Sequence, residues 1–275
     1  MTLVLQISDP HFGTEQPPVV EALVRLAHTQ APDLVVLSGD ITQRARRVQF
    51  RAAREFMERL GVADTLAIPG NHDIPLFNAA ARLFSPYANY SREFGDELEP
   101  VFESDQLLVL AVNTTRPYRH IDGEVSGKQI ERVAQRLALA TETQLRIVVT
   151  HQPVAVMRAQ DETNLLHGRA EAIRRWAHAG ADLILGGHIH LPYVLGLHEQ
   201  FVDLPRKFWA VQAGTAVSSR VRYEVGNSVN LIRYHGLVEH RREVVVEQWD
   251  YAESLQGFHP AAVSNLDIDS STHQD

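Results

Sequence analysis

Short apolar runs alternate with amphipathic stretches over the first two-thirds of the chain. The apolar runs have the length of buried strands and lie at residues 3–8, 33–38, 65–68, 145–150 and 181–185. The stretches between them carry apolar residues at helical spacing and predict helices at residues 18–30, 48–60, 127–140 and 169–179. This alternation of strands and helices predicts an α/β fold.

The last third of the chain has a different pattern. Strands are predicted at residues 193–197, 207–212, 228–234 and 243–249, with no helix between them. Before this part, residues 75–100 predict loops and short helices, and residues 101–114 predict two strands. The polar residues 264–275 predict a disordered tail. We therefore expect one domain over residues 1–263, with a β-rich closing part after residue 190.

The composition suits a folded domain and argues against some partners. The chain has 275 residues, of which 44% are hydrophobic, and its 34 acidic and 26 basic side chains give a net charge of −8. This balance disfavours a nucleic-acid partner, because such proteins usually present a basic surface. The absence of cysteine excludes disulfides and thiolate metal ligands.

The first residues predict no targeting signal. Met1 and Thr2 lead directly into an apolar strand, without the basic and long apolar regions of a signal peptide. No apolar run approaches the roughly 20 residues of a membrane-spanning helix. We expect a cytoplasmic protein that has no membrane partner.

Polar side chains follow each of five predicted strands, at the edge where open α/β sheets bind ligands. They are Asp9 and His11; Asp40; Asn71, His72 and Asp73; His151; and His188 and His190. With His72 set apart, they form a group of oxygen and imidazole donors. Such a group suits divalent manganese, iron or zinc better than calcium, which prefers oxygen alone.

Each of these residues also has a purely structural interpretation. The Asp9-Pro10 pair is typical of a turn, Gly39-Asp40 is a common dipeptide, and a lone histidine such as His151 is more often structural or on the surface. The structural interpretation would have to hold at five strand ends together and in one order. The combined pattern therefore favours a metal site.

The five motifs resemble those of the calcineurin-like metallophosphoesterase superfamily. In order, they are Asp9-x-His11, Gly39-Asp40, Gly70-Asn71-His72-Asp73, Val148-x-x-His151 and Gly187-His188-x-His190. The resemblance implies a two-sheet β-sandwich flanked by helices, with two metal ions at the carboxyl ends of the strands. It implies a first ion held by Asp9, His11, Asp40 and His190, and a second held by Asp40, Asn71, His151 and His188. Manganese or iron is the expected metal, with zinc as an alternative.

The positive charge of such a metal site implies that it binds and hydrolyses a phosphate ester. Two divalent ions carry four positive charges, of which Asp9 and Asp40 offset two, so the site attracts an anionic phosphate. A water between the ions would lose a proton near neutral pH and attack phosphorus as a bridging hydroxide. His72 and the bridging Asp40 are the expected catalytic residues, and His72 would stabilise the phosphoryl oxygens or protonate the leaving group. Asp73 would either orient a histidine or only form a turn.

Departures from other branches of the superfamily narrow the resemblance. Gln43 stands where purple acid phosphatases carry a tyrosine, no Asp-Arg-Gly segment follows Asp40 as it does in protein Ser/Thr phosphatases, and His72 stands where lipid-precursor hydrolases usually carry arginine. The remaining pattern is similar to class III cyclic-nucleotide phosphodiesterases and glycerophosphodiesterases. It implies a small phosphodiester substrate, such as a cyclic nucleotide, and a homodimer.

Some further residues are candidates for substrate contact. Three arginines, Arg44, Arg46 and Arg47, follow Asp40 closely and could reach a phosphate, although a solvated helix start is the better interpretation for at least two of them. Arg119 and His120 could line the pocket from a polar loop. The aromatic residues Tyr87, Tyr90 and Phe94 could stack on a base, although packing or an oligomer contact is more usual.

Three other functions stay open. A phosphomonoesterase or nucleotidase would use the same site, and because a monoester carries close to two charges it would favour extra cationic residues near the metals. A DNA-repair-type nuclease would need a basic cleft and usually an added domain. A metal-free binding scaffold would have lost ligands, whereas every ligand position is filled here.

Overall fold

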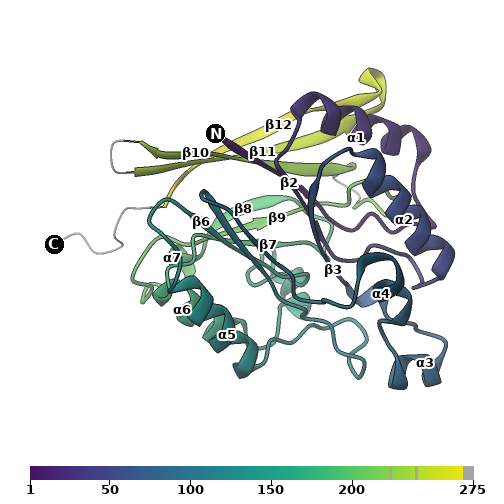
Figure 1. The fold of residues 1–275 in the computed structure, drawn as a ribbon, viewed down its shortest axis with the longest axis horizontal. Coiled ribbons are helices and arrows are strands. Elements are labelled where there is room, and N and C mark those ends of the chain that lie inside the picture. The colour runs from purple at the N-terminus through teal and green to yellow at the C-terminus, as the bar shows by residue number, and fades with distance from the viewer. Residues whose placement is uncertain (223–224, 239–240, 269–275) are drawn as a thin grey trace.

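Two β-sheets of six strands each lie face to face at the centre of the molecule (Figure 1). The computed structural model describes residues 1–222, 225–238 and 241–268. The first sheet has the order β12-β11-β10-β1-β2-β3, and the second has the order β4-β5-β6-β7-β9-β8. The predicted two-sheet sandwich is therefore confirmed.

The strands of the first sheet are β1 (Thr2–Ile7), β2 (Leu34–Ser38), β3 (Asp64–Ile68), β10 (Ser228–Val238), β11 (Arg241–Ala252) and β12 (Gly257–Asp267). Those of the second are β4 (Val101–Glu103), β5 (Leu107–Ala111), β6 (Leu145–Val149), β7 (Leu183–Gly186), β8 (Tyr193–Gly196) and β9 (Trp209–Gln212). Strands β1, β2 and β3 run parallel, as do β5, β6, β7 and β9. Their carboxyl ends therefore lie at one edge of each sheet.

Helices cover the outer faces of both sheets (Figure 1). Helices α1 (Pro17–Gln30), α2 (Arg47–Arg59) and α4 (Ala88–Phe94) pack on the first sheet, and α5 (Gly127–Leu137) and α6 (Arg169–His178) pack on the second. The described chain also contains α3 (Ala79–Phe84), α7 (Leu197–Gln200) and the 3-10 turns Asn71–Asp73, Ala159–Asn164 and Glu253–Leu255. Every helix predicted from the apolar spacing is present.

The apolar runs are continuous because the strands are buried on both faces. In β1, Leu3, Leu5 and Ile7 face the helices, whereas Val4 packs between the two sheets. Burial of one such side chain stabilises the fold by about 1.5–3 kcal/mol. The two faces of β1 therefore join the helix layer to the central sandwich.

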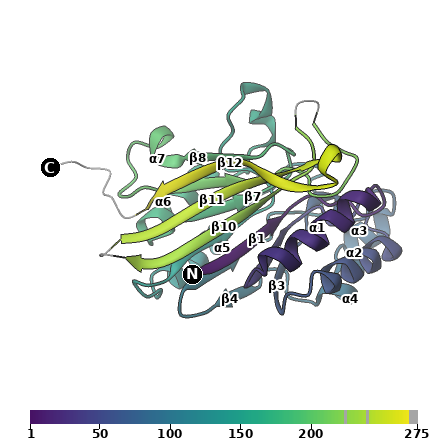
Figure 2. The same cartoon turned by 90° about the horizontal axis from the view of Figure 1, so that it is seen from above.

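The closing part of the chain differs from the prediction in two places. The short helix α7 interrupts the strands expected there. Strand β12 continues to Asp267, and the following Ile268 is buried, so the predicted start of a disordered tail at residue 264 is wrong. Residues 269–275 of that predicted tail lie outside the described residues. Figure 2 shows β10, β11 and β12 running beside β1.

Buried amides join the two sheets beneath the strand ends. The Gln6 amide donates to the Gly186 carbonyl at 3.0 Å, and the Asn230 amide donates to Gln6 Oε1 at 3.0 Å. The Gln212 amide donates to the carbonyl of Gly187. This network holds the turn before His188 against the end of β1.

Among the described residues, no helix combines the length and the apolar character needed to cross a bilayer.

Candidate metal centre

The predicted ligands meet at the carboxyl edge of the sheets and form two adjacent clusters. Asp9, His11 and His190 form the first, and within it one ligand atom of each residue lies within 4.8 Å of the others. The second cluster contains Asp40, His151 and His188 within the same distance.

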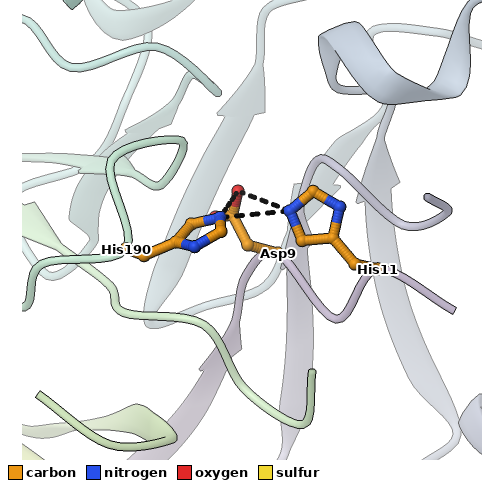
Figure 3. A group of neighbouring side chains, drawn as sticks. All are labelled: Asp9, His11 and His190. Carbon is orange, nitrogen blue, oxygen red and sulfur yellow. Dashed lines mark hydrogen bonds and ion pairs between the residues drawn. The ribbon is translucent and has the colours of Figure 1, made fainter. Parts of the chain in front are cut away.

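The first cluster turns one donor atom of each residue toward a common point (Figure 3). Asp9 Oδ1 lies 3.3 Å from His190 Nε2 and 3.8 Å from His11 Nε2, and the two histidine nitrogens are 3.1 Å apart. The Asp9 oxygen that faces away from this point already has hydrogen-bond partners. Asp9 Oδ2 accepts hydrogen bonds from Ser8 Oγ at 2.6 Å and from the His188 amide at 2.9 Å.

The second cluster is oriented in the same way. His151 donates from Nδ1 to the Ser38 carbonyl at 2.9 Å, which leaves its Nε2 facing Asp40 Oδ1 and Asn71 Oδ1, each at 3.3 Å. Asp40 Oδ2 lies 3.7 Å from His11 Nε2 of the first cluster. Asp40 therefore faces both clusters, as a ligand shared by two ions would.

The donor atoms fit a pair of divalent cations. Among the described residues, Asp9 Oδ1 and His188 Nδ1 are buried and have no hydrogen-bond partner. An unsatisfied buried polar atom costs about 1–3 kcal/mol, and a cation in each cluster would remove that cost. Mixed imidazole and oxygen donors suit manganese, iron or zinc. Binding through the inward atoms would keep the hydrogen bonds that orient Asp9, His151 and His190 from outside.

In each cluster the carboxylate and one histidine reinforce each other's charge. Burial opposes ionisation, but the facing His190 lowers the pKa of Asp9 to about 2. Burial likewise opposes protonation of His151, yet the Asp40 carboxylate raises the pKa of that histidine to about 9.

The other histidine of each cluster stays neutral. Burial lowers the pKa of His11 to about 3, and burial together with the neighbouring His151 lowers that of His188 to about 4. Without metal, a proton on His151 therefore stands in for part of the cationic charge that the carboxylates attract. Burial opposes protonation of His190 as well, but the Asp9 carboxylate raises the pKa of that histidine.

Five of the ligand positions have a strained backbone. The φ angles of Asp9, His11, Asp40, His188 and His190 are 51°, 44°, 47°, 72° and 54°. Left-handed conformations of non-glycine residues cost about 1–3 kcal/mol each and collect at functional sites. The surrounding fold supplies this energy and aims the ligands inward.

Two motif glycines make room for the ligands. Gly39 has a φ of 95°, and a Cβ there would collide with the His151 ring. A Cβ on Gly187 would collide with Ser8 Oγ and Asp9 Oδ2. Glycine is therefore required at both positions by close approach of the ligands.

His72 lies beside the clusters with its ring fixed on both sides. Its Nδ1 donates to the Gln43 carbonyl at 3.0 Å, and its Nε2 lies 3.1 Å from Nη1 of Arg220. The His72 backbone amide donates to Asp40 Oδ1 at 2.8 Å. Since one ring nitrogen donates to a carbonyl, the other is an acceptor in this arrangement.

A small pocket next to His72 is lined by two of the residues that the sequence suggested for substrate contact. Arg44 and His120 line it together with Asn71 and Arg82. Arg46 and Arg47 instead lie exposed at the start of α2, which agrees with the solvated interpretation.

Asp73 and the aromatic candidates have structural roles. Asp73 accepts hydrogen bonds from the backbone of Ile41, Thr42 and Gly70 and from the Thr42 hydroxyl, which agrees with the interpretation that it only forms a turn. Three aromatic residues pack in the core or against it rather than facing the site: Tyr87, Tyr90 and Phe94.

Arg220 is a site residue that the sequence did not indicate. Its carbonyl accepts a hydrogen bond from His190 Nδ1 at 2.6 Å, and its guanidinium contacts His72. It lies in a polar segment between two strands, with no motif around it. Local spacing therefore gave no signal for it.

The donor clusters at the strand ends fit a metal-dependent enzyme. The sequence profile of the calcineurin-like phosphoesterases matches residues 2–192, and the chain belongs to that family. It is a metal-dependent hydrolase of phosphate esters, as the motifs predicted.

Two curated relatives carry names of phosphodiesterases. A protein named a probable cyclic nucleotide phosphodiesterase from a Synechococcus species is 29% identical over 209 residues, which cover 71% of this chain and 76% of that protein. A probable glycerophosphodiester phosphodiesterase from Arcobacter nitrofigilis is 28% identical over 213 residues, covering 68% of this chain and 71% of that protein.

Solved structures share the fold at low identity. A dimetal phosphatase from Danio rerio has a TM-score of 0.66 at 12% identity, covering 98% of this chain and 99% of that one. A purple acid phosphatase from yellow lupin has a TM-score of 0.63 at 13% identity, covering 94% of this chain and 52% of the other. These similarities show the two-sheet architecture alone.

Proposed function

We propose that this enzyme is a phosphodiesterase that hydrolyses small diesters, such as cyclic nucleotides, with two divalent ions. The observation that carries the proposal is the pair of donor clusters that share Asp40 and have His72 beside them. The names of the two curated relatives, one a probable cyclic nucleotide phosphodiesterase and the other a probable glycerophosphodiester phosphodiesterase, support a diester as substrate.

The ligand assignment is part of this proposal. Asp9, His11 and His190 would hold one ion, and Asn71, His151 and His188 the other, with Asp40 binding both. When bound, the ions offset the negative charge of the phosphate and lower the pKa of water. Manganese or iron is the proposed metal at both positions, because the donor atoms are nitrogen and oxygen and the chain has no thiolate.

His72 would act on the substrate rather than on the metals. Its backbone amide is tied to Asp40, so the ring is held at a fixed place beside both clusters. From there a protonated Nε2 could donate to the oxygen that leaves phosphorus, and a neutral ring could only accept. The Gln43 carbonyl keeps the other nitrogen protonated and thus fixes which nitrogen faces the substrate.

A phosphomonoesterase is the second candidate, because cationic side chains lie near the clusters. Arg220 contacts His72, and Arg44 lines the pocket next to it. These charges would suit the nearly doubly charged phosphate of a monoester. A homodimer and a cytoplasmic location stay predictions from the sequence.

The ratio of kcat/KM for bis(p-nitrophenyl) phosphate to that for p-nitrophenyl phosphate separates the two candidates. The assay uses metal-stripped protein that has been resupplied with manganese. A ratio well above one supports the diesterase and justifies assays with cyclic AMP and glycerophosphodiesters. A ratio well below one would replace the diesterase with the phosphomonoesterase.

A further inference from the structure

The segment that follows β9 crosses the end of β1 and reaches the metal centre. The Thr215 hydroxyl donates to the Asp9 carbonyl at 2.6 Å, and the Ala216 amide donates to the Ser8 carbonyl at 2.9 Å. Beyond these contacts, Arg222 Nη1 donates to Asp161 Oδ1 at 3.0 Å and to the Ile189 carbonyl at 3.1 Å. The segment is therefore attached to the site on both sides of Arg220.

This attachment places the Arg220 guanidinium between residues of the site. Its Nη1 lies 3.1 Å from Gln43 Oε1, 3.1 Å from His72 Nε2 and 3.4 Å from His11 Nδ1. The side chain is exposed, and Nε and Nη2 have no hydrogen-bond partner among the described residues. Two of its three donor nitrogens are thus available to a ligand.

One of the three contacts of Nη1 is lost when the proposed metal ion binds. If His11 binds an ion through its inward Nε2, its ring proton sits on Nδ1, which can no longer accept from Arg220. Gln43 Oε1 and His72 Nε2 remain beside Nη1, while Nε and Nη2 stay available. The guanidinium therefore presents free donors at the edge of a site that would attract an anion.

We propose that Arg220 binds the non-bridging oxygens of the substrate phosphoryl group. A planar guanidinium can bind two phosphoryl oxygens at once through paired hydrogen bonds. The residue lies beyond residues 2–192, the part of the chain that the family profile matches. The inference rests on the proposed phosphoester hydrolysis and assigns a function to the β-rich closing part of the chain.

The test measures binding of inorganic phosphate to manganese-loaded protein by calorimetry, together with manganese content. Arg220→Met removes the charge and keeps the carbonyl that contacts His190, so manganese content should equal that of the wild type. Phosphate affinity should fall about 10- to 100-fold, which is typical of losing hydrogen bonds between charged groups. Arg220→Lys should lie between the two, and Arg54→Met, on the exposed face of α2, should match the wild type.

Two outcomes would overturn the assignment. Wild-type phosphate affinity in Arg220→Met would show that the guanidinium does not bind the phosphoryl group. Loss of manganese in Arg220→Met would show that the side chain only maintains the metal site. Hydrolysis of bis(p-nitrophenyl) phosphate by the wild type is measured in parallel, because its absence counts against the proposed function, whereas the phosphate affinities still decide the role of Arg220.

Discussion

Replacement of Asp73 by alanine should destabilise the protein, because this carboxylate holds together the two turns that carry Asp40 and His72. At pH 8 the group is ionised, since that is above the value of about 7 to which burial and the neighbouring Asp40 raise its pKa. It accepts from the backbone amides of Ile41 at 2.9 Å, Thr42 at 2.8 Å and Gly70 at 2.9 Å.

The size of the effect follows from these three amides. Each would lose its partner in the interior, at about 1–3 kcal/mol. Removal of a buried charge and entry of water offset part of the loss, so we take the lower end and expect about 3 kcal/mol in total. For a chain of this size that corresponds to a fall in Tm of about 6–12 °C.

Differential scanning calorimetry of the metal-free protein measures this change. The matched control is Asp64→Ala, an exposed aspartate at the start of β3, whose replacement should change the stability by about 0.5 kcal/mol or less. A Tm of Asp73→Ala within 2 °C of the wild type would refute the structural role given to Asp73, since ~1 kcal/mol already shifts the Tm by that much.

Three further predictions concern the site itself. His72→Ala should keep the manganese content and lower kcat about 10²- to 10⁴-fold, and loss of manganese would instead make His72 a ligand. Gly187→Ala should lower metal affinity and stability, because its Cβ would meet Ser8 and Asp9, whereas Gly127→Ala, where a Cβ meets nothing, should do neither. Manganese binding at pH 7.5 should release at least one proton, and its affinity should rise as the pH rises toward 9, because the Asp40 carboxylate raises the pKa of His151 to about 9 against the effect of burial. Calorimetry in buffers of different ionisation enthalpy counts the protons, and an affinity independent of pH would contradict this account.

The sequence predicted the strand ends well because burial on both faces imposes a simple pattern. Continuous apolar runs such as that of Leu34–Ser38 are too short for most helices and are typical of central strands, and the polar residues after parallel strands reach one edge of the sheet. The sequence could therefore place the residues of the two donor clusters at one edge, whereas their left-handed backbone conformations depend on the assembled fold and have no local signal.

The closing part was predicted less well because its strands are partly exposed. Strand β12 lies at the edge of its sheet, carries Pro260 next to a register shift and buries few side chains. An edge strand of this kind tolerates proline and needs no alternation of apolar residues. The polar character of residues 264–267 therefore suggested disorder although the backbone pairs with β11.

The roles of Asp73 and Arg220 depend on contacts between distant segments. Asp73 accepts from amides about 30 positions earlier in the chain, and Arg220 meets His72 across a separation of 148 residues. A motif names the residue type at a position, but only the fold decides which groups surround it. The sequence therefore left open whether Asp73 orients a histidine or only forms a turn, and it gave no signal for Arg220.

The number of manganese ions bound per chain tests the central claim most directly. Equilibrium dialysis of metal-stripped wild type against manganese, followed by elemental analysis, should give two ions per chain. Asp40→Ala should bind fewer ions and lose hydrolysis, because both clusters share this carboxylate. One ion or none in the wild type, or two ions retained in Asp40→Ala, would contradict a dinuclear centre built around Asp40.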